Sequence, residues 1–477
     1  MAADYDLVIL GGTLEGRYAA LSAVGYGARV ALIEPPGTYF RRQQAKHLLR
    51  GLQQLGEGRQ RQSVSKWFEQ AEISSGSQPP SPKFDWLALV RWSAIAAKTQ
   101  QPQLSPDVLS ARGVDVILAM PKRLSRQLIV TVAGRKLSTR AVLAAFGSVA
   151  LPLFGACNCL TGVEQLLEAN SLPQSICVWG DAPIAVEWSQ ALNAMGISVS
   201  LVTNRFLPNE DSEVRSWVLA QLTATGIQLI DPVEASGRDA QLNRLHLPLG
   251  RIKPALMLPD FVYYPASDYP NVDEQIPERT YLLSNQHLQT AHPRVFACGS
   301  LIHGQSVGDA TSQAEAQIAV WNALFVPNRR VEYSSIPHSY HRFARVGLTP
   351  RFAKEDYSPT GDYTVFTASS GNSTDLSRSM PLPSYCKLIC KRGRLQSIHL
   401  LGDGADQLAV SLAAVIGQPI YQLLSFAERI PAPPVAEGLA SLVLTAANQS
   451  QQTRWQPRHW RRDWAENWFN WRRSQKD

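Results

Sequence analysis

The chain has 477 residues, of which 45% are hydrophobic and 18% are charged, and its formal net charge is +7. This is an ordinary globular composition, long enough for three domains and a large core. Six cysteines spread over this length do not make a disulfide framework, which indicates a reducing compartment. The first residues lead directly into an expected strand and leave no room for a signal peptide. We therefore expect a cytoplasmic protein.

The first 34 residues contain the most informative pattern, a strand, a glycine turn, a helix and a second strand. The apolar run before Gly11 suits a buried parallel strand, Gly11 permits the tight turn, and Gly16 lets the helix pack closely on the sheet. Glu34 ends the second strand, where a carboxylate can accept hydrogen bonds from ribose hydroxyls. Thr13 stands at the middle glycine position. The pattern predicts a dinucleotide site, against the alternative of an ordinary turn.

Residues 141–160 form an uncharged stretch that is long enough to cross a bilayer. Its glycines and Pro152, and its position between two dinucleotide units, favour a buried strand followed by a loop.

A second strand, turn and helix begins at Ser175. Gly180, Ala182 and Ala185 occupy the three glycine positions, so small residues remain where the backbones must approach. The following strand ends in Thr-Asn-Arg, with Arg205 last, where the first unit has an acid. An arginine at this place suits a 2′-phosphate and favours NADPH over NADH. The alternative is a site that no longer binds a nucleotide.

Two such units in one chain resemble the flavoprotein disulfide reductases, which include dihydrolipoamide dehydrogenase, glutathione reductase and mercuric reductase. Further segments match in the order of this family, and the resemblance covers residues 5 to 440: AAFGS at 144–148, RVFACGS at 294–300, and two interface-domain segments at 331–349 and 387–409. The resemblance implies an α/β protein with two Rossmann-like dinucleotide-binding domains and an α+β carboxyl-terminal interface domain. It also implies bound FAD, NADPH or NADH as the electron donor, and a homodimer.

The same resemblance divides the chain into four parts. These are a split FAD-binding domain, an NAD(P)-binding-like domain, a dimerisation-like domain and a Trp/Arg-rich tail helix, at residues 1–155 with 285–326, 156–284, 327–450 and 451–477. Two segments, residues 74–83 and 356–382, have a composition that predicts surface loops.

The cofactor residues follow from the matching motifs. For FAD they are Gly11, Gly12, Thr13, Gly16, Glu34, Gly147, Gly299 and Ser300. For NAD(P) they are Gly180, Ala182, Ala185, Glu187 and Arg205. Ser300 replaces an aspartate that holds a ribityl hydroxyl in the family, and it can keep that hydrogen bond without the strength of a charge. Leu48 replaces the lysine that pairs with Glu187 in the family, so a solvated surface carboxylate is an equal interpretation of Glu187.

The catalytic residues of the family are missing. Tyr39 and Gln44 stand at the positions of the redox cysteine pair, and neither side chain offers the ionisable sulfur that a disulfide relay requires. Ala432 stands at the position of the family's acid/base histidine, while Pro433 and Glu437 remain. A methyl group cannot transfer protons. No catalytic residue is identified, and both losses affect disulfide reduction alone.

The six cysteines offer no clear substitute for the lost pair. Cys386 and Cys390 lie on a strand-like segment, where a spacing of four residues separates them by about 13 Å, too far for a disulfide. Cys157 and Cys159 have no neighbouring histidine or further cysteine, so no metal site is expected. We interpret the cysteines as packing residues.

The last 27 residues change composition abruptly. Four tryptophans fall at helical spacing and are edged by arginines, namely Trp460, Trp464, Trp468 and Trp471. Such a face suits an interface with anionic lipid at the inner side of a membrane, or a partner protein, or the protein's own surface. Nucleic acid is not expected as a partner, because no basic face or binding motif accompanies the tail.

Two functional hypotheses follow. The first is an FAD-binding NAD(P)H-dependent oxidoreductase that passes electrons from flavin to a non-disulfide acceptor, such as a quinone, a small oxidant or a redox partner. The second is a catalytically inactive scaffold of the same fold that docks a membrane or a protein through its tail. A disulfide reductase that uses other cysteines is a third alternative.

Overall fold

A computed structural model describes residues 3–71, 85–125, 127–150, 160, 163–231, 245–248, 252–254, 263–265, 280–282, 284–303, 307–340, 342–347, 363–370, 384–402 and 404–420. The contacts divide the chain into two compact units. Unit 1 contains residues 1–208 and 216–331, and unit 2 contains residues 209–215 and 332–477.

The larger sheet of unit 1 has the strand order β3-β2-β1-β6-β5-β4, with β15 also paired to β6. Its strands are β1 (Tyr5–Leu10), β2 (Val30–Glu34), β3 (Val114–Leu118), β4 (Pro121–Leu124), β5 (Ile129–Val132), β6 (Arg135–Ala144) and β15 (Val295–Ala297). Strands β1, β2, β3, β6 and β15 pair in parallel, whereas β4, β5 and β6 pair antiparallel. Leu10 lies opposite both Ile33 and Ala144, so the carboxyl ends of β1, β2 and β6 meet at one edge of the sheet.

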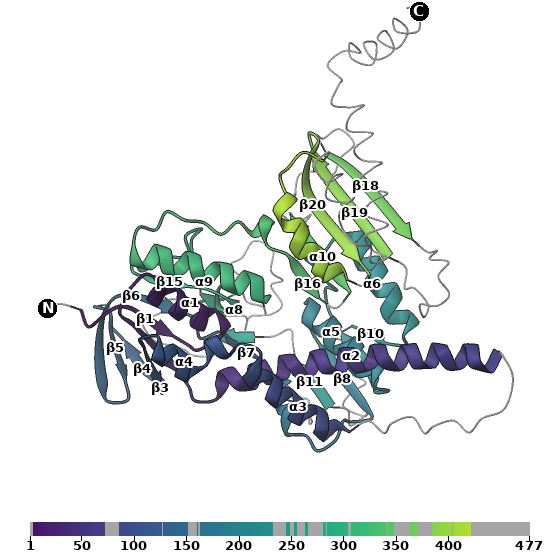
Figure 1. Cartoon of the computed structure of the whole chain (residues 1–477), viewed down its shortest axis with the longest axis horizontal. Coiled ribbons are helices and arrows are strands. Elements are labelled where there is room, and N and C mark those ends of the chain that lie inside the picture. Colours follow the sequence, from purple (N-terminus) through teal and green to yellow (C-terminus); the bar gives the residue numbers. More distant parts are fainter. Residues whose placement is uncertain are drawn as a thin grey trace, which may run out of the picture. The chain divides into compact units, whose positions relative to one another are not determined.

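Both faces of this sheet are buried, as expected for parallel strands. Leu7 and Ile9 pack on one face with alanines of α1 (Leu14–Gly25) and α9 (Asp309–Leu324), while Val8 and Leu10 pack on the other. Figure 1 shows α1 and α9 close together beside this sheet. The remaining helices before the second sheet are α2 (Thr38–Ala71), α3 (Trp86–Thr99), the 3-10 helix η1 (Pro102–Leu104) and α4 (Pro106–Ala111).

The second sheet of unit 1 is fully parallel, in the order β10-β9-β8-β11. Its elements are β8 (Ser175–Trp179), α5 (Pro183–Ala194), β9 (Ser198–Val202), β10 (Gln228–Ile230) and β11 (Leu245–Pro248). Trp179 lies opposite Val202, which places the turn after β8 beside the end of β9. Shorter elements are η2 (Val163–Glu168), β7 (Ser148–Ala150) with β12 (Ile252–Pro254), β13 (Tyr263–Pro265) with β14 (Thr280–Leu282), and α8 (Ser300–His303).

Unit 2 contains an antiparallel sheet in the order β16-β17-β20-β19-β18. Its elements are η5 (Tyr333–Ser335), β16 (His338–Tyr340), β17 (Phe343–Gly347), β18 (Tyr363–Ser370), β19 (Ser384–Lys391), β20 (Arg394–Leu401), α10 (Ala405–Leu412) and η6 (Ala413–Val415). Leucines of β20 and α10 form its apolar core. Helix α6 (Ser212–Ala224) begins in this unit and continues in unit 1.

One local prediction is wrong. The surface loop expected at residues 356–382 contains β18, which pairs with β19 along its whole length from Tyr363 opposite Lys391 to Ser370 opposite Ser384. The Ser, Thr and Gly content of these residues predicts a loop, whereas pairing with β19, the next strand in the chain, stabilises an extended strand. The mixed α/β class with parallel sheets is confirmed. The finer four-part division of the chain stays a prediction.

Several expectations fall outside the described residues, namely residues 74–83, Pro152, Cys157, Cys159, Ala432 and the tryptophan tail. Among the helices that are described, none combines the length and the apolar character needed to cross a membrane. The start of the apolar stretch 141–160 forms the end of β6, buried in the larger sheet.

Candidate functional site

The turn between β1 and α1 can be made only with glycine at two positions. Gly11 has φ of +111°, and a Cβ there would lie 2.2 Å from the Cα of Phe146. A Cβ on Gly16 would lie 2.1 Å from the carbonyl oxygen of Gly11. Side chains at either place would collide with backbone. The close approach of α1 to the sheet therefore depends on both glycines.

Thr13, at the middle glycine position, closes this turn with its side chain. Its hydroxyl accepts a hydrogen bond from Gly16 N at 3.4 Å, as the N-cap of α1, and donates one to the carbonyl of Ala145 at 2.6 Å. The threonine thus ties the start of the helix to the end of β6. The departure from glycine leaves the turn intact.

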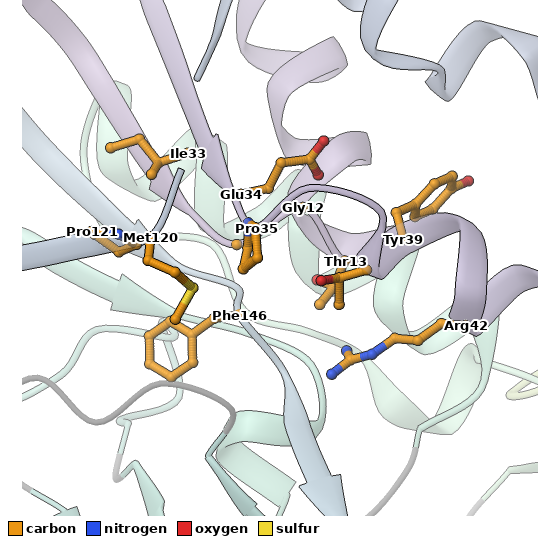
Figure 2. Close-up of a pocket in the computed structure, with 12 residues that line it drawn as sticks. Gly12, Thr13, Ile33, Glu34, Pro35, Tyr39, Arg42, Met120, Pro121 and Phe146 are labelled. Carbon is orange, nitrogen blue, oxygen red and sulfur yellow. The ribbon is translucent and has the colours of Figure 1, made fainter. Parts of the chain in front are cut away.

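A pocket opens beside this turn (Figure 2). It is lined by Gly11, Gly12, Thr13, Ile33, Glu34, Pro35, Thr38, Tyr39, Arg42, Met120, Pro121 and Phe146. The structure therefore brings together four of the predicted flavin residues, Gly11, Gly12, Thr13 and Glu34, whereas Gly16 does not line the pocket. Sequence reasoning did not identify Arg42, Met120 or Pro121 as pocket residues, because they come from α2 and from the β3–β4 connection.

Glu34 forms an ion pair with Arg17 inside the protein. The two side chains are only 4% and 1% exposed, and Arg17 also donates to the carbonyls of Gly12, at 3.0 Å, and Leu104. The guanidinium lies 4.0 Å from the centre of the Tyr39 ring. Burial raises the pKa of Glu34 and lowers the pKa of Arg17, and the attraction between them opposes both shifts. Sequence analysis missed Arg17, which lies just after the last glycine of the motif.

The second carboxylate oxygen of Glu34, Oε2, is buried and has no hydrogen-bond partner. A buried carboxylate oxygen normally has a donor, and a ribose hydroxyl is the donor that this position would meet in a dinucleotide fold. The orphaned oxygen, the glycine turn and the start of α1 fit the adenosine end of FAD.

A second group of acids surrounds Gly299, after β15. Its N–H donates to Glu315 Oε2 at 2.7 Å, and Oε1 of Glu315 lies 2.5 Å from His303 Nε2. The Glu15 carboxyl lies against the same glycine, because a Cβ on Gly299 would be 2.1 Å from Glu15 Oε1. Burial raises the pKa of Glu15 to about 7, while Arg42 opposes and Glu315 adds to that shift.

Ser300, the residue predicted to replace the ribityl-binding aspartate, is the first residue of α8. Its hydroxyl oxygen accepts a hydrogen bond from Ser148 Oγ at 2.9 Å. Arg42 Nη2 donates to the carbonyl of the same Ser148 at 2.9 Å, and its guanidinium lies beside Gly147. These contacts place Gly147 and Ser300 near one another and leave their cofactor roles as predictions.

The positions of the family's cysteine pair are filled by side chains with other contacts. Tyr39 is buried and its hydroxyl donates to Gln101 Oε1 at 3.3 Å. Gln44 Nε2 donates to the carbonyl of Val90 on α3 at 3.2 Å. Leu48 is fully buried. Burial raises the pKa of Tyr39 to about 12, so the phenol stays protonated at neutral pH.

The second glycine turn, between β8 and α5, also adopts the expected arrangement. Gly180 N donates to the carbonyl of Val202 at 3.0 Å, Ala182 is the N-cap residue of α5, and Ala185, in the first turn of α5, is fully buried. Glu187 lies on α5 and is half-buried, and Arg205 is exposed after β9. The predicted NAD(P) residues thus lie on the β8–α5–β9 segment, and their nucleotide contacts stay a prediction.

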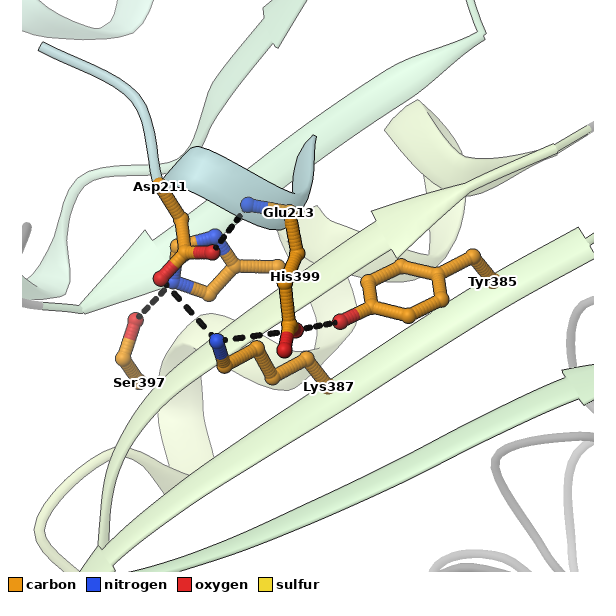
Figure 3. A network of polar contacts seen from close by, with 6 residues as sticks. All are labelled: Asp211, Glu213, Tyr385, Lys387, Ser397 and His399. Carbon is orange, nitrogen blue, oxygen red and sulfur yellow. Dashed lines mark hydrogen bonds and ion pairs between the residues drawn. The ribbon is translucent and has the colours of Figure 1, made fainter. Parts of the chain in front are cut away.

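Unit 2 contains a partly buried charge network that sequence reasoning did not find (Figure 3). Lys387 Nζ lies 3.0 Å from Asp211 Oδ2 and 3.0 Å from Glu213 Oε2. The Tyr385 hydroxyl donates to the same oxygen of Glu213. The acids precede or begin α6, whereas the lysine and tyrosine belong to β19. Their separation of more than 170 positions in the chain explains why no local pattern reveals the pairing.

Beside that network, Arg345 of β17 pairs with Glu210, with Nε 3.2 Å from Oε2 and both side chains buried. His399 is fully buried, with Nε2 3.1 Å from Ser397 Oγ and Nδ1 lacking a partner. Burial, together with the positive charges of Arg345 and Lys387, holds the pKa of His399 well below its usual value. The imidazole is therefore neutral in the folded protein.

The cysteines within the described residues are buried and not disulfide-bonded, namely Cys177, Cys298, Cys386 and Cys390. Burial raises the pKa of Cys298, Cys386 and Cys390, the last to about 12. No group of three or more metal-binding side chains occurs in the described part of the chain.

A model of the pyridine nucleotide-disulphide oxidoreductases matches residues 5–323, which is more than half of the chain. The protein belongs to the pyridine nucleotide-disulphide oxidoreductase family. Members of this family depend on FAD, take electrons from NAD(P)H and are typically homodimers.

Named relatives agree with this membership. The chain is 25% identical over 360 residues to a dihydrolipoyl dehydrogenase of Acholeplasma laidlawii, covering 70% of this chain and all of the relative. It is 23% identical over 493 residues to a mercuric reductase of Lysinibacillus sphaericus, covering 93% and 82%. The HOCl-induced flavoprotein disulfide reductase RclA of Escherichia coli has a similar fold, with a TM-score of 0.66, 17% identity and coverage of 92% and 99%. The predicted resemblance is confirmed.

Proposed function

We propose that this oxidoreductase binds FAD, takes electrons from NAD(P)H and passes them to an acceptor that is not a disulfide, such as a quinone, a small oxidant or a redox partner. The observation that carries the proposal is the state of the relay positions, where Tyr39 and Gln44 are built into the protein by other contacts. When bound, FAD supplies the redox chemistry, because a flavin can exchange electrons with a nicotinamide and with many acceptors.

Tyr39 is part of the support of the pocket. Its ring covers the guanidinium of Arg17, which in turn holds Glu34. A disulfide relay needs a thiolate that attacks sulfur. The Tyr39 phenol contains no sulfur, and it is not ionised at neutral pH because burial raises its pKa to about 12. The position that relays electrons in the family thus supports the proposed ribose end of the site.

The other described thiols are also unsuited to a relay. Cys386 and Cys390 point into the core of the unit 2 sheet, and Cys298 lies under the Gly299 turn among buried acids. Desolvation and the nearby negative charge of Glu15 and Glu315 keep the Cys298 thiol protonated. Reactive cysteines need the opposite surroundings, with positive charge and partial exposure.

The protein's own residues would bind and orient the cofactors. We propose that Glu34 Oε2 accepts a hydrogen bond from a ribose hydroxyl. The start of α1 would stabilise the diphosphate, and Arg42 would add positive charge beside Gly147. The predicted roles of Gly12, Gly299 and Ser300 belong to the same proposal. The Ala432 position stays a sequence prediction.

The test is an anaerobic comparison of acceptors with the purified flavoprotein. We expect NAD(P)H-dependent reduction of a quinone or ferricyanide, no turnover of lipoamide or glutathione disulfide, and unchanged rates when the six cysteines are replaced by serine. Partial reduction should yield no long-wavelength thiolate–flavin absorption band. Disulfide turnover that disappears in the cysteine-free variant would contradict the proposal.

The homodimer, membrane or partner docking through the tail, and a cytoplasmic location are further parts of the proposal. Deletion of residues 454–477 tests docking and turnover separately. An enzyme should still reduce its acceptor after this deletion, even though it no longer docks through the tail. A chain that binds no redox-active flavin but loses a partner on this deletion would be the alternative scaffold.

A further inference from the structure

Asp181, in the glycine turn between β8 and α5, organises the chain that follows β9. Its Oδ1 accepts hydrogen bonds from Thr203 Oγ1 at 2.7 Å, Asn204 N at 3.0 Å and Arg205 N at 3.2 Å. Its backbone carbonyl accepts a fourth from Leu207 N at 3.0 Å. One acidic residue therefore joins the turn to the end of the neighbouring strand.

This junction is where a dinucleotide fold recognises the adenosine ribose. In such folds an acid at the end of the second strand accepts hydrogen bonds from the ribose hydroxyls. Here that strand ends at Val202 and is followed by Thr203, which carries no charge. The parallel register that sets Trp179 opposite Val202 brings Asp181 to the same place from the other strand. The carboxylate of Asp181 therefore lies beside the end of β9.

The carboxylate has a direct consequence for the choice of nucleotide. A ribose diol can donate hydrogen bonds to a carboxylate, whereas a 2′-phosphate brings negative charge toward it. Two negative charges about 4 Å apart repel each other, and they repel more strongly near a protein surface than in bulk water. Arg205 would by itself favour a 2′-phosphate. Its side chain is exposed to solvent, so salt screens its attraction for that phosphate.

We propose that Asp181 is a specificity-determining residue that selects NADH over NADPH as the electron donor. The inference rests on the proposed function and sharpens it, since the sequence pattern at Arg205 favours NADPH. The selection arises by charge, and the hydrogen bonds of Asp181 hold that charge in place.

The test measures binding of the oxidised nucleotides to the flavoprotein by isothermal titration calorimetry. NAD⁺ should bind at least roughly tenfold more tightly than NADP⁺. The Asp181→Asn variant keeps an acceptor oxygen for the three donors and removes only the charge, so the gap should narrow to within about twofold through tighter NADP⁺ binding. Asp107→Asn removes one charge from an exposed position of α4 and should leave the wild-type ratio of affinities unchanged.

Salt dependence provides a second measurement that needs no variant. Raising the salt concentration from about 0.05 M to about 0.5 M should reduce the preference for NAD⁺, because screening weakens the repulsion by Asp181. If Arg205 dominated, NADP⁺ would bind at least as well as NAD⁺ at low salt and would weaken selectively as salt rises. That result, or an unchanged ratio in a folded Asp181→Asn protein, would overturn the inference.

The outcomes also separate this inference from the proposed function. Binding of NAD⁺ with the predicted preference, but no reduction of the flavin by NADH, would contradict the function and support the role of Asp181. Reduction of the flavin by both nucleotides with a preference for NADPH would support the function and contradict the role of Asp181. Binding of neither nucleotide by the folded flavoprotein would overturn both.

Discussion

The guanidinium of Arg17 contacts the carboxylate of Glu34 in a place where both side chains are almost completely buried. The arginine also holds two backbone carbonyls and lies under the Tyr39 ring, so the pair is one part of a fixed polar cluster. Charges are costly to bury unless they are paired and hydrogen-bonded. The cluster therefore fixes the position of Glu34, whose second oxygen is buried beside Gly12 and has no hydrogen-bond partner.

The first prediction follows from removing half of this pair. Arg17→Met should lower the free energy of unfolding by about 3–5 kcal/mol, because it leaves the Glu34 carboxylate buried without its counter-ion. Arg29→Met is a matched control, since Arg29 is 63% exposed and its pairing with Asp6 should contribute about 1 kcal/mol or less. Urea denaturation followed by circular dichroism measures both. Equal losses in the two variants would contradict this account of the cluster.

The second prediction concerns the buried carboxyl of Glu15. Burial raises its pKa from 4.5 to about 7, so the folded protein holds a proton that the unfolded chain has released. Stability from this group is complete below about pH 4.5 and is lost as pH rises through about 7. Glu15→Gln should remove this pH-dependent decrease in the free energy of unfolding, which amounts to roughly 3 kcal/mol by pH 8.

Urea unfolding at several values between pH 5 and pH 8 tests the Glu15 prediction. Exposed Glu332 provides the control, because Glu332→Gln should leave the pH dependence of the wild-type protein unchanged. A Glu15→Gln protein with the full wild-type slope would show that another group is responsible.

The third prediction has the opposite sign and concerns His399. Its pKa is held well below the usual value, mainly by burial, so the unfolded state binds a proton that the folded state does not. Stability is present above about pH 6.5 and is lost as pH falls below that value. His399→Gln should lose less stability than the wild-type protein between pH 7 and pH 5.

Thermal unfolding at these pH values measures the His399 effect, with His292→Gln as the control because His292 is only partly buried. A His399→Gln protein that loses as much stability in acid as the wild-type would refute the assignment of this effect to His399.

The fourth prediction concerns the thiols. Cys298, Cys386 and Cys390 are buried with raised pKa values, so iodoacetamide should not modify them in the native protein at pH 8. All three should react after unfolding in urea, and mass spectrometry of the peptides can follow each one separately. Rapid labelling of native Cys298 would argue for a thiol with a redox role.

Local sequence predicts the two strand, turn and helix units well, because the physical demands at each are local. Position 11 requires a positive φ, and position 16 requires a close approach to the backbone of the turn, so both favour glycine. The apolar runs predict buried parallel strands. The cluster around Glu34 could be predicted only in part, since the partner Arg17 occupies an unremarkable helical position whose direction depends on the packed sheet.

Contacts between distant parts of the chain explain what sequence reasoning missed. Lys387 meets Asp211 across 176 positions of the chain. Strand β18 is a different case, because it pairs with the next strand along the chain, β19, and its own Ser- and Thr-rich sequence gives no strand pattern. Asp181 lies between Gly180 and Ala182, and a pattern of small residues predicts the backbone of the turn but not the contacts of this side chain. Its role becomes visible only when Thr203 is placed beside it.

An anaerobic visible-absorption titration with NADH, repeated with NADPH, tests the central claim most directly. We expect the purified protein to show the yellow absorption band of bound flavin, and this band to bleach on addition of nucleotide and to return when a quinone is added. A missing band, or a band that neither nucleotide bleaches, would contradict the oxidoreductase and favour the scaffold.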